Sequence, residues 1–136
     1  MKPFVDTNVL VYANDPADRR KQQIARETLL EHAESLVLSA QVLSEFYSVV
    51  TRRFSPLLGL EEARTIVDDL RRFPIVVIDE QLVLDAITIS AKAMLSYWDG
   101  LIVSAAHAAG CDVVLTEDLS HGSMVADVRI ENPFDQ

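Results

Sequence analysis

The stretch YWDGLIVSAAHAAGCDVVLTEDLSHG, residues 97–122, gives the clearest indication of the fold. Small and apolar residues at helical spacing predict a helix that begins at Ser96 and runs to Ala109, where Gly110 is a typical terminating residue. The apolar run that follows at residues 113–115 predicts a short buried strand. A helix that leads directly into a buried strand is typical of parallel α/β sheets.

Short apolar segments alternate with longer amphipathic ones along the rest of the chain, and four more of them predict strands, at residues 3–5, 36–38, 75–78 and 128–130. The segment at 75–78 shows no polar alternation, so we expect it to be buried on both faces. Helices are predicted at residues 9–13, 19–33, 39–54, 60–73 and 80–95. We therefore predict one domain over residues 1–136, with a three-layer α/β/α architecture and a mainly parallel central sheet of four to five strands.

The chain carries a formal net charge of −9, which argues against a simple basic nucleic-acid-binding protein. An acidic chain still permits a nucleic-acid enzyme whose carboxylates hold cations. Cys111 is the only cysteine, so an internal disulfide is excluded. No apolar run approaches the roughly 18 residues of a membrane span and no leader is recognisable, so we expect a cytoplasmic protein without membrane contact.

Two aspartates follow predicted strands. Asp6 comes directly after the strand at residues 3–5, and Asp118 follows the strand at 113–115 after two residues. Ligands of open parallel sheets bind outside the carboxyl ends of the strands, which makes both positions candidate site residues. A helix cap or a turn is the structural alternative for each aspartate taken alone.

Two further acids lie on apolar helix faces. Glu45 lies at helical spacing from Val42 and Val49, and Asp99 has the same relation to Ile102. The alternatives are an edge position from which Glu45 reaches water, and a place for Asp99 in the first helical turn, where the helix dipole favours a carboxylate. A buried carboxylate without a partner costs several kcal/mol, so each acid needs water, a proton or a cation.

The four acids, taken together, suggest a common site. Helices that carry Glu45 and Asp99 can flank the crevice formed by the strand ends at Asp6 and Asp118. Carboxylates in one crevice repel one another, and a hard divalent cation removes that penalty. Ligation by oxygen alone favours Mg²⁺ or Mn²⁺ over zinc, so we hypothesise a cup of carboxylates around a metal ion.

These residues occur in stretches that resemble the PIN domain, and more closely the VapC-type toxins of bacterial and archaeal toxin–antitoxin pairs. The matching stretches are FVDTNVLVYA, SAQVLSEFYSVVTRR, SYWDGLIVSAA and LTEDLSHG, and the final VRIENPF resembles the end of the family's domain. Nearly the whole chain is covered, with the acids in the family's order. The resemblance implies a PIN-like fold for the predicted single domain.

The resemblance also implies an activity and its partners. It implies an Mg²⁺- or Mn²⁺-dependent endoribonuclease that hydrolyses RNA phosphodiester bonds, is inhibited by a cognate VapB-type antitoxin and forms a homodimer. The apolar residues 9–12 then belong either to an antitoxin-receiving groove or to the core. Carried over by position, the catalytic and metal-binding residues are Asp6, Glu45, Asp99 and Asp118, with Thr116 and Asn8 in supporting roles. Glu117 occupies a position that varies in the family and is left out.

RNA binding by so acidic a chain requires local positive charge. The pair Arg52-Arg53 and the run at residues 19–21 are candidates, and solvated helix ends are the alternative for both. Stacking on RNA bases requires aromatic rings, for which a place in the core is the alternative. The aromatic candidates are Tyr12, Tyr47 and Trp98.

Three other classes of protein remain as alternatives. A phosphatase or phosphotransferase of the haloacid dehalogenase type needs a second aspartate two residues after the first, where this chain has Asn8. A phosphotransfer receiver domain would use Asp79 after the strand at 75–78, but needs a cluster of acids near the first strand, where Asp6 stands alone. A PIN-like partner-binding domain without catalysis is the third alternative.

Overall fold

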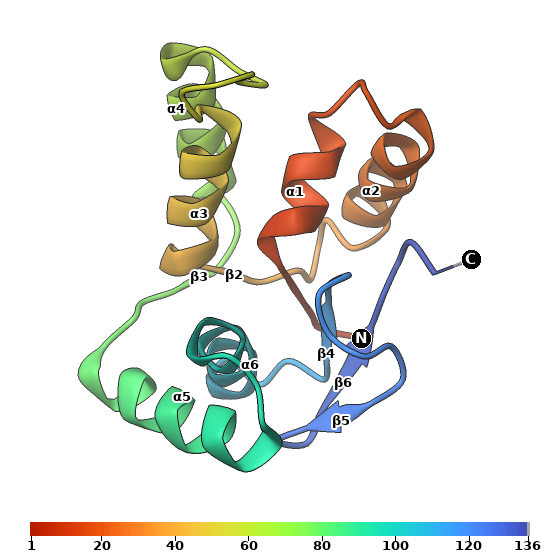
Figure 1. Cartoon of the computed structure of the whole chain (residues 1–136). Coiled ribbons are helices and arrows are strands. Elements are labelled where there is room, and N and C mark those ends of the chain that lie inside the picture. Colours follow the sequence, from red (N-terminus) through yellow and green to blue (C-terminus); the bar gives the residue numbers. More distant parts are fainter. Residues whose placement is uncertain (136) are drawn as a thin grey trace.

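The computed structural model describes residues 1–135 and contains short strands and longer helices in alternation (Figure 1). The strands are β1 (Pro3–Val5), β2 (Leu38–Ser39), β3 (Ile75–Val76), β4 (Val113–Leu115), β5 (Met124–Val125) and β6 (Val128–Glu131). The helices are α1 (Thr7–Ala13), α2 (Arg19–Glu31), α3 (Ala40–Val50), α4 (Leu60–Leu70), α5 (Glu80–Ala93) and α6 (Tyr97–Ala108). In the described part of the chain, no helix has the length and apolar character needed to cross a membrane.

The central sheet has four strands in the order β1-β4-β6-β5, and only the β5–β6 pair is antiparallel. β2 and β3 form a second parallel pair, which a single bridge between Phe4 and Val37 joins to β1. Figure 1 shows the strands between two groups of helices, with α5 and α6 in one group and α1 to α4 in the other. The predicted mainly parallel α/β/α fold is confirmed.

The parallel pairing of β1 with β4 forms the centre of the core. Phe4, Val5, Val113 and Val114 are all fully buried, as expected for strands covered on both faces. The register pairs Val5 with Leu115, so both strands end at the same edge of the sheet. The residues that follow them therefore lie next to each other at the carboxyl ends.

Two expectations about individual elements are wrong, one about the burial of a strand and one about the end of a helix. The segment at residues 75–78 is not buried on both faces, because β3 pairs only with β2 and lies at the edge, where Val77 is 74% exposed. The helix α3 ends at Val50 rather than at residue 54. The amides of Leu57 and Leu58 both donate to the Val50 carbonyl, so the chain turns back over the helix end.

At Gly100, α6 packs closely on α5. A Cβ atom added at Gly100 would lie 2.7 Å from the Cβ of Ser90 and 2.8 Å from the carbonyl oxygen of Ala86. A side chain here would push the two helices apart, since a backbone carbonyl cannot rotate away. Gly100 also follows Asp99 directly, so this close approach sets the position of that acid.

We predict that Gly100→Ala lowers the free energy of unfolding. Alanine favours a helix by up to about 1 kcal/mol, but overpacking against a backbone typically costs about 1–3 kcal/mol, so a net loss is expected. Urea unfolding measures the change. Gly59→Ala is the control with the smaller expected cost, because no atom lies within 4 Å of a Cβ added there. Equal or greater stability of Gly100→Ala would contradict the packing argument.

Candidate active site

The sheet register brings Asp6 and Thr116 into contact. The Asp6 amide donates to the Leu115 carbonyl at 3.0 Å, which continues the β1–β4 ladder by one bond. The Thr116 hydroxyl donates to Asp6 Oδ2 at 2.8 Å, and the Thr7 amide donates to Asp6 Oδ1 at 2.7 Å. Asp6 is thus both the N-cap of α1 and a buried carboxylate whose two oxygens accept neutral donors.

Asn8 connects the first acid to the second. Its Nδ2 donates to Thr116 Oγ1 and to Asp118 Oδ2, both at 3.1 Å, and lies 3.5 Å from Asp6 Oδ2. Its Oδ1 accepts from the Glu117 amide at 3.3 Å, and the Asp118 amide donates to Thr116 Oγ1 at 3.0 Å. The two residues expected to support the site, Asn8 and Thr116, therefore contact both strand-end acids.

The helix-borne acids are held by a different contact. Gln41 Nε2 donates to Glu45 Oε1 at 2.6 Å and to the Trp98 carbonyl at 3.2 Å, which joins α3 to the first turn of α6. Ser96 is the N-cap of α6, and its hydroxyl accepts from the Asp99 amide at 3.1 Å. Asp99 therefore takes part in the predicted helix start and is also next to the crevice described below.

Two adjoining hollows show how the acids converge. Asn8, Glu45 and Asp118 line the hollow between α1 and α3. Ser96, Asp99 and Asp118 line the hollow beside the start of α6. Asp118 belongs to both hollows, so it links the hollow that contains Glu45 to the one that contains Asp99.

The electrostatics agree with this arrangement. Asp6 is only 4% exposed, and burial raises its pKa from 3.8 to about 6. Hydrogen bonds from Thr116 and Thr7 lower the pKa, whereas the charges of Asp118 and Glu45 raise it. Within residues 1–135, no cationic side chain is among the main influences on this pKa, and the hydrogen-bond donors to the carboxylate are neutral groups.

Asp99 shows a weaker form of the same effect. Burial raises its pKa, a hydrogen bond with Ser96 lowers it, and the charge of Asp118 raises it further. Asp118 thus acts on both Asp6 and Asp99, which supports a single electrostatic unit.

The donors of this unit are of the kind that suits a hard divalent cation. Carboxylate, amide and hydroxyl oxygens are the ligands that Mg²⁺ and Mn²⁺ prefer. Thr7 is among the residues that line the hollow between α1 and α3, and its Oγ1 is buried without a hydrogen-bond partner in residues 1–135. Within the same residues, no three Asp, Glu, His or Cys side chains are arranged to hold a metal as they stand. The donor chemistry fits, while metal binding by the four acids stays a prediction.

Glu117 was left out of the candidate site, yet it fixes the loop that carries Asp118. Glu117 Oε1 accepts from the Tyr12 hydroxyl at 2.7 Å, and its Oε2 accepts from Lys21 Nζ at 2.8 Å. Lys21 Nζ also donates to the Tyr12 hydroxyl and lies 4.5 Å from the centre of the Tyr12 ring. We call Tyr12, Lys21 and Glu117 the loop clamp. No local sequence pattern predicts the loop clamp, because its members are up to 105 residues apart.

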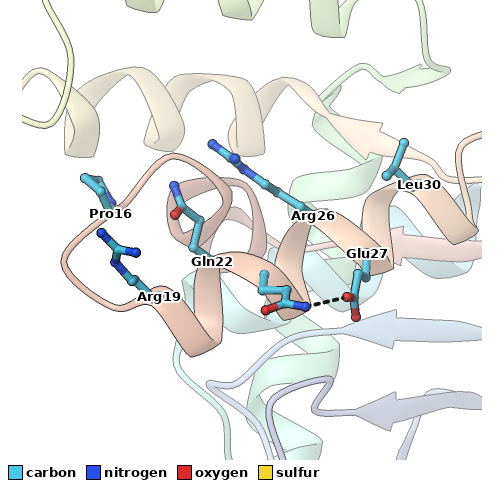
Figure 2. A pocket seen from close by; sticks show the side chains of 7 residues that line it. Pro16, Arg19, Gln22, Arg26, Glu27 and Leu30 are labelled. Atoms are coloured by element: carbon cyan, nitrogen blue, oxygen red, sulfur yellow. Dashed lines mark hydrogen bonds between the residues drawn. The ribbon is translucent and has the colours of Figure 1, made fainter.

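The basic residues proposed for RNA contact have separate positions. Arg52 lines the hollow between α1 and α3 together with Glu45 and Asp118, so it is near the acids. Arg19 lies instead in a groove along α2 with Arg26, as Figure 2 shows, and none of the four candidate acids lines that groove. The residues 19–21 therefore do not act as one basic patch, since Lys21 is held in the loop clamp.

The comparisons with known proteins agree with the fold. The family model of the PIN domain matches residues 4–124, a range that includes all four candidate acids. The fold is thus a mainly parallel α/β domain with acids at the carboxyl ends of its strands. The chain belongs to the PIN domain family.

Solved structures with the same fold include toxin–antitoxin proteins. FitAB bound to an IR36 DNA fragment is 25% identical, with a TM-score of 0.67 over 98% of this chain and 96% of that chain. DNA-bound VapBC from Salmonella typhimurium is 19% identical, with a TM-score of 0.71 over 98% of both chains. VapC20 of Mycobacterium tuberculosis, a sarcin-ricin loop cleaving toxin, is 16% identical, with a TM-score of 0.70 over 86% of this chain and 90% of that chain. No curated protein sequence matches.

The raised pKa of Asp6 predicts a pH-dependent stability difference between the metal-free protein and Asp6→Asn. The unfolded chain releases the Asp6 proton near pH 3.8 and the folded chain near pH 6, so the folded state binds more protons in between. Wild-type stability therefore falls relative to the variant as pH rises from 4 to 6, and the deficit is complete above that value. The two pKa values correspond to a change of about 3 kcal/mol.

Urea unfolding in chelator at pH 4 and pH 7 measures this change. Asp69→Asn is the matched control, because Asp69 is exposed on α4. A stability difference between wild type and Asp6→Asn that does not grow with pH would show that burial does not perturb Asp6.

The loop clamp predicts an energetic coupling between Lys21 and Glu117. Their side chains are only 26% and 23% exposed, so we expect a coupling free energy of about 1 kcal/mol in a double-mutant cycle of Lys21→Met and Glu117→Gln. The pair Arg71–Asp68 is the control, with a similar 2.8 Å contact but exposures of 71% and 68%. We expect coupling near zero there. Equal coupling in both pairs would contradict the clamp.

Proposed function

We propose that this protein is a divalent-metal-dependent endoribonuclease and the toxin of a VapBC-type toxin–antitoxin pair. The observation that carries the proposal is the convergence of Asp6, Glu45, Asp99 and Asp118 around the carboxyl ends of β1 and β4 in a PIN-domain chain. The structural likeness to VapC20, a sarcin-ricin loop cleaving toxin, supports the same class of reaction.

The proposed chemistry needs both a metal and fixed carboxylates. Asp6, Glu45, Asp99 and Asp118 would hold Mg²⁺ or Mn²⁺, which would lower the pKa of a coordinated water and offset charge on the phosphate. Asp6 is held in one orientation by Thr7 and Thr116, and Asn8 holds Asp118. These hydrogen bonds fix the oxygens before substrate arrives, which is the condition for effective orientation of reacting groups.

The hollow between α1 and α3 supports a protein partner for the toxin. Besides the candidate acids, it is lined by the apolar residues Val11, Val49 and Leu57 and by the acidic residues Asp15 and Glu117. A segment that is both basic and apolar complements such a surface. Of the residues 9–12, Val9 and Leu10 belong to the core, whereas Val11 and Tyr12 line the hollow.

We propose that a cognate VapB-type antitoxin places such a segment in this hollow and blocks the acids. The likeness of the fold to DNA-bound VapBC from Salmonella typhimurium supports a partner of this class. A homodimer of the toxin is part of the proposal. The RNA contact proposed for Arg52 uses the same hollow, which explains how one partner would exclude the other.

Cleavage assays on purified protein without antitoxin test the proposal. We expect cleavage of structured RNA such as tRNA, or of unstructured RNA, in Mg²⁺ or Mn²⁺ and none in chelator. Asp6→Asn should lose at least about a hundredfold in rate, because a displaced ligand displaces the attacking water. Asp69→Asn is the matched control and should cleave at the wild-type rate. Cleavage in chelator, or undiminished cleavage by folded Asp6→Asn, would contradict the proposed mechanism.

A further inference from the structure

Trp98 is the only tryptophan of the chain, and its side chain is 64% exposed. It lies in the first turn of α6, directly before Asp99, and packs edge-to-face with Tyr97 at a centroid distance of 5.1 Å. A large aromatic ring usually gains stability from burial, so an exposed indole beside two candidate acids requires an explanation. The sequence analysis gave a position in the core as the alternative for Trp98, and the exposure of the ring excludes that alternative.

The indole borders a hollow of its own. Besides Trp98, this hollow is lined by Gln41, Ser44, Glu45 and Leu101. Among the described residues that line it there is no lysine or arginine, so the hollow lacks a positive charge to attract a phosphate. It combines an apolar ring surface with amide, hydroxyl and carboxylate groups, a composition that suits a flat polar heterocycle such as a nucleobase.

Gln41 adds an independent sign of a ligand. The residue is 8% exposed, and its Nε2 is already used by Glu45 and by the Trp98 carbonyl. Its Oε1 is buried and has no hydrogen-bond partner in the described part of the chain. An unpaired buried acceptor is costly, and the N–H groups on the edges of nucleobases are complementary donors.

We propose that Trp98 and the hollow beside it form a stacking site for one unpaired nucleobase of the substrate, next to the cleaved phosphate. The inference rests on the proposed ribonuclease function. Glu45 lines this hollow and is also one of the four acids, and Asp99 is adjacent to Trp98 in the chain. A base on the indole therefore brings its own phosphate toward the acids. Stacking tolerates different bases, so the site selects single-stranded or looped RNA rather than one sequence.

A second copy of the chain is the competing occupant of this surface. The half-buried carboxylate of Glu45 argues against it, because covering an unpaired charge with protein is costly and interface cores are depleted of charged residues. Leu84 and Ile87 on α5 are 58% and 51% exposed and offer a less charged surface for such a contact. The nucleobase is therefore the occupant that the hollow fits.

The single tryptophan allows a direct binding test on the wild-type protein. In chelator, where no cleavage is expected, the Trp98 fluorescence should be quenched in a saturable way by a short single-stranded RNA. The same RNA with abasic nucleotides, and inorganic polyphosphate, should leave the fluorescence unchanged. Equal quenching by the abasic RNA or polyphosphate, or no quenching by any RNA, would overturn the stacking site.

Kinetics in Mg²⁺ separate stacking from structural effects. Trp98→Ala should raise KM by about 5- to 150-fold, the range expected for the loss of one stacked base, with a smaller change in kcat. Trp98→Phe should restore most of the binding, and Phe54→Ala is the control for another exposed ring, 79% exposed. Circular dichroism confirms that each variant is folded.

The remaining outcomes also decide between the hypotheses. If Trp98→Ala lowers the molecular mass in solution but leaves RNA binding unchanged, the surface is a contact between copies and the stacking site is wrong. If wild type cleaves no RNA yet its fluorescence responds to bases alone, the stacking site stands and the proposed ribonuclease function fails.

Discussion

The parallel pairing of β1 with β4 is the constraint on which the site depends. It consists of three residue pairs between segments that are 110 residues apart in the chain. The pairing makes Asp6 and Thr116 neighbours, and their 2.8 Å hydrogen bond extends the backbone ladder into the side chains. Asn8, Asp118 and the loop clamp all attach to this pair, directly or through one residue. A shift of one residue in this register would point Asp6 to the opposite face of the sheet.

The same pairing creates an energetic conflict. It buries the Asp6 carboxylate at the end of a fully apolar strand, where desolvation dominates its pKa. Neutral donors offset part of this cost, but Asp118 and Glu45 add repulsion. A lysine or arginine in contact with Asp6 would remove the conflict and would also occupy the place of the proposed metal ion. The site is therefore less stable than it could be, which is typical of functional sites.

The sequence predicted those features that follow from local patterns. The strands before Asp6 and Asp118 were predicted because continuous apolar runs mark strands that are buried on both faces. The acids on α3 and α6 were selected as candidates because helical spacing places them beside apolar residues. β3 was misjudged, since an apolar run does not reveal that a strand lies at the edge. β5 was missed, because its turn residues Ala126 and Asp127 have φ values of 49° and 64° without the usual glycine or asparagine signal. The partners of Glu117 could not be predicted, because they come from α1 and α2 through tertiary contacts.

A net charge of −9 is the remaining difficulty for a protein proposed to bind RNA. Most nucleic-acid-binding proteins attract phosphates with lysine and arginine, whose contacts make the binding affinity strongly dependent on salt concentration. Here, within residues 1–135, Arg52 is the one basic residue among those that line the hollows beside the acids. The proposed alternatives are a metal ion, which converts the acids from a repulsive into an attractive group for phosphate, and an exposed indole, which binds a base without charge. Both act only within a few residues of the cleaved bond. A binding surface of this kind disfavours generic RNA through its overall charge and favours substrates that present an unpaired base beside the phosphate.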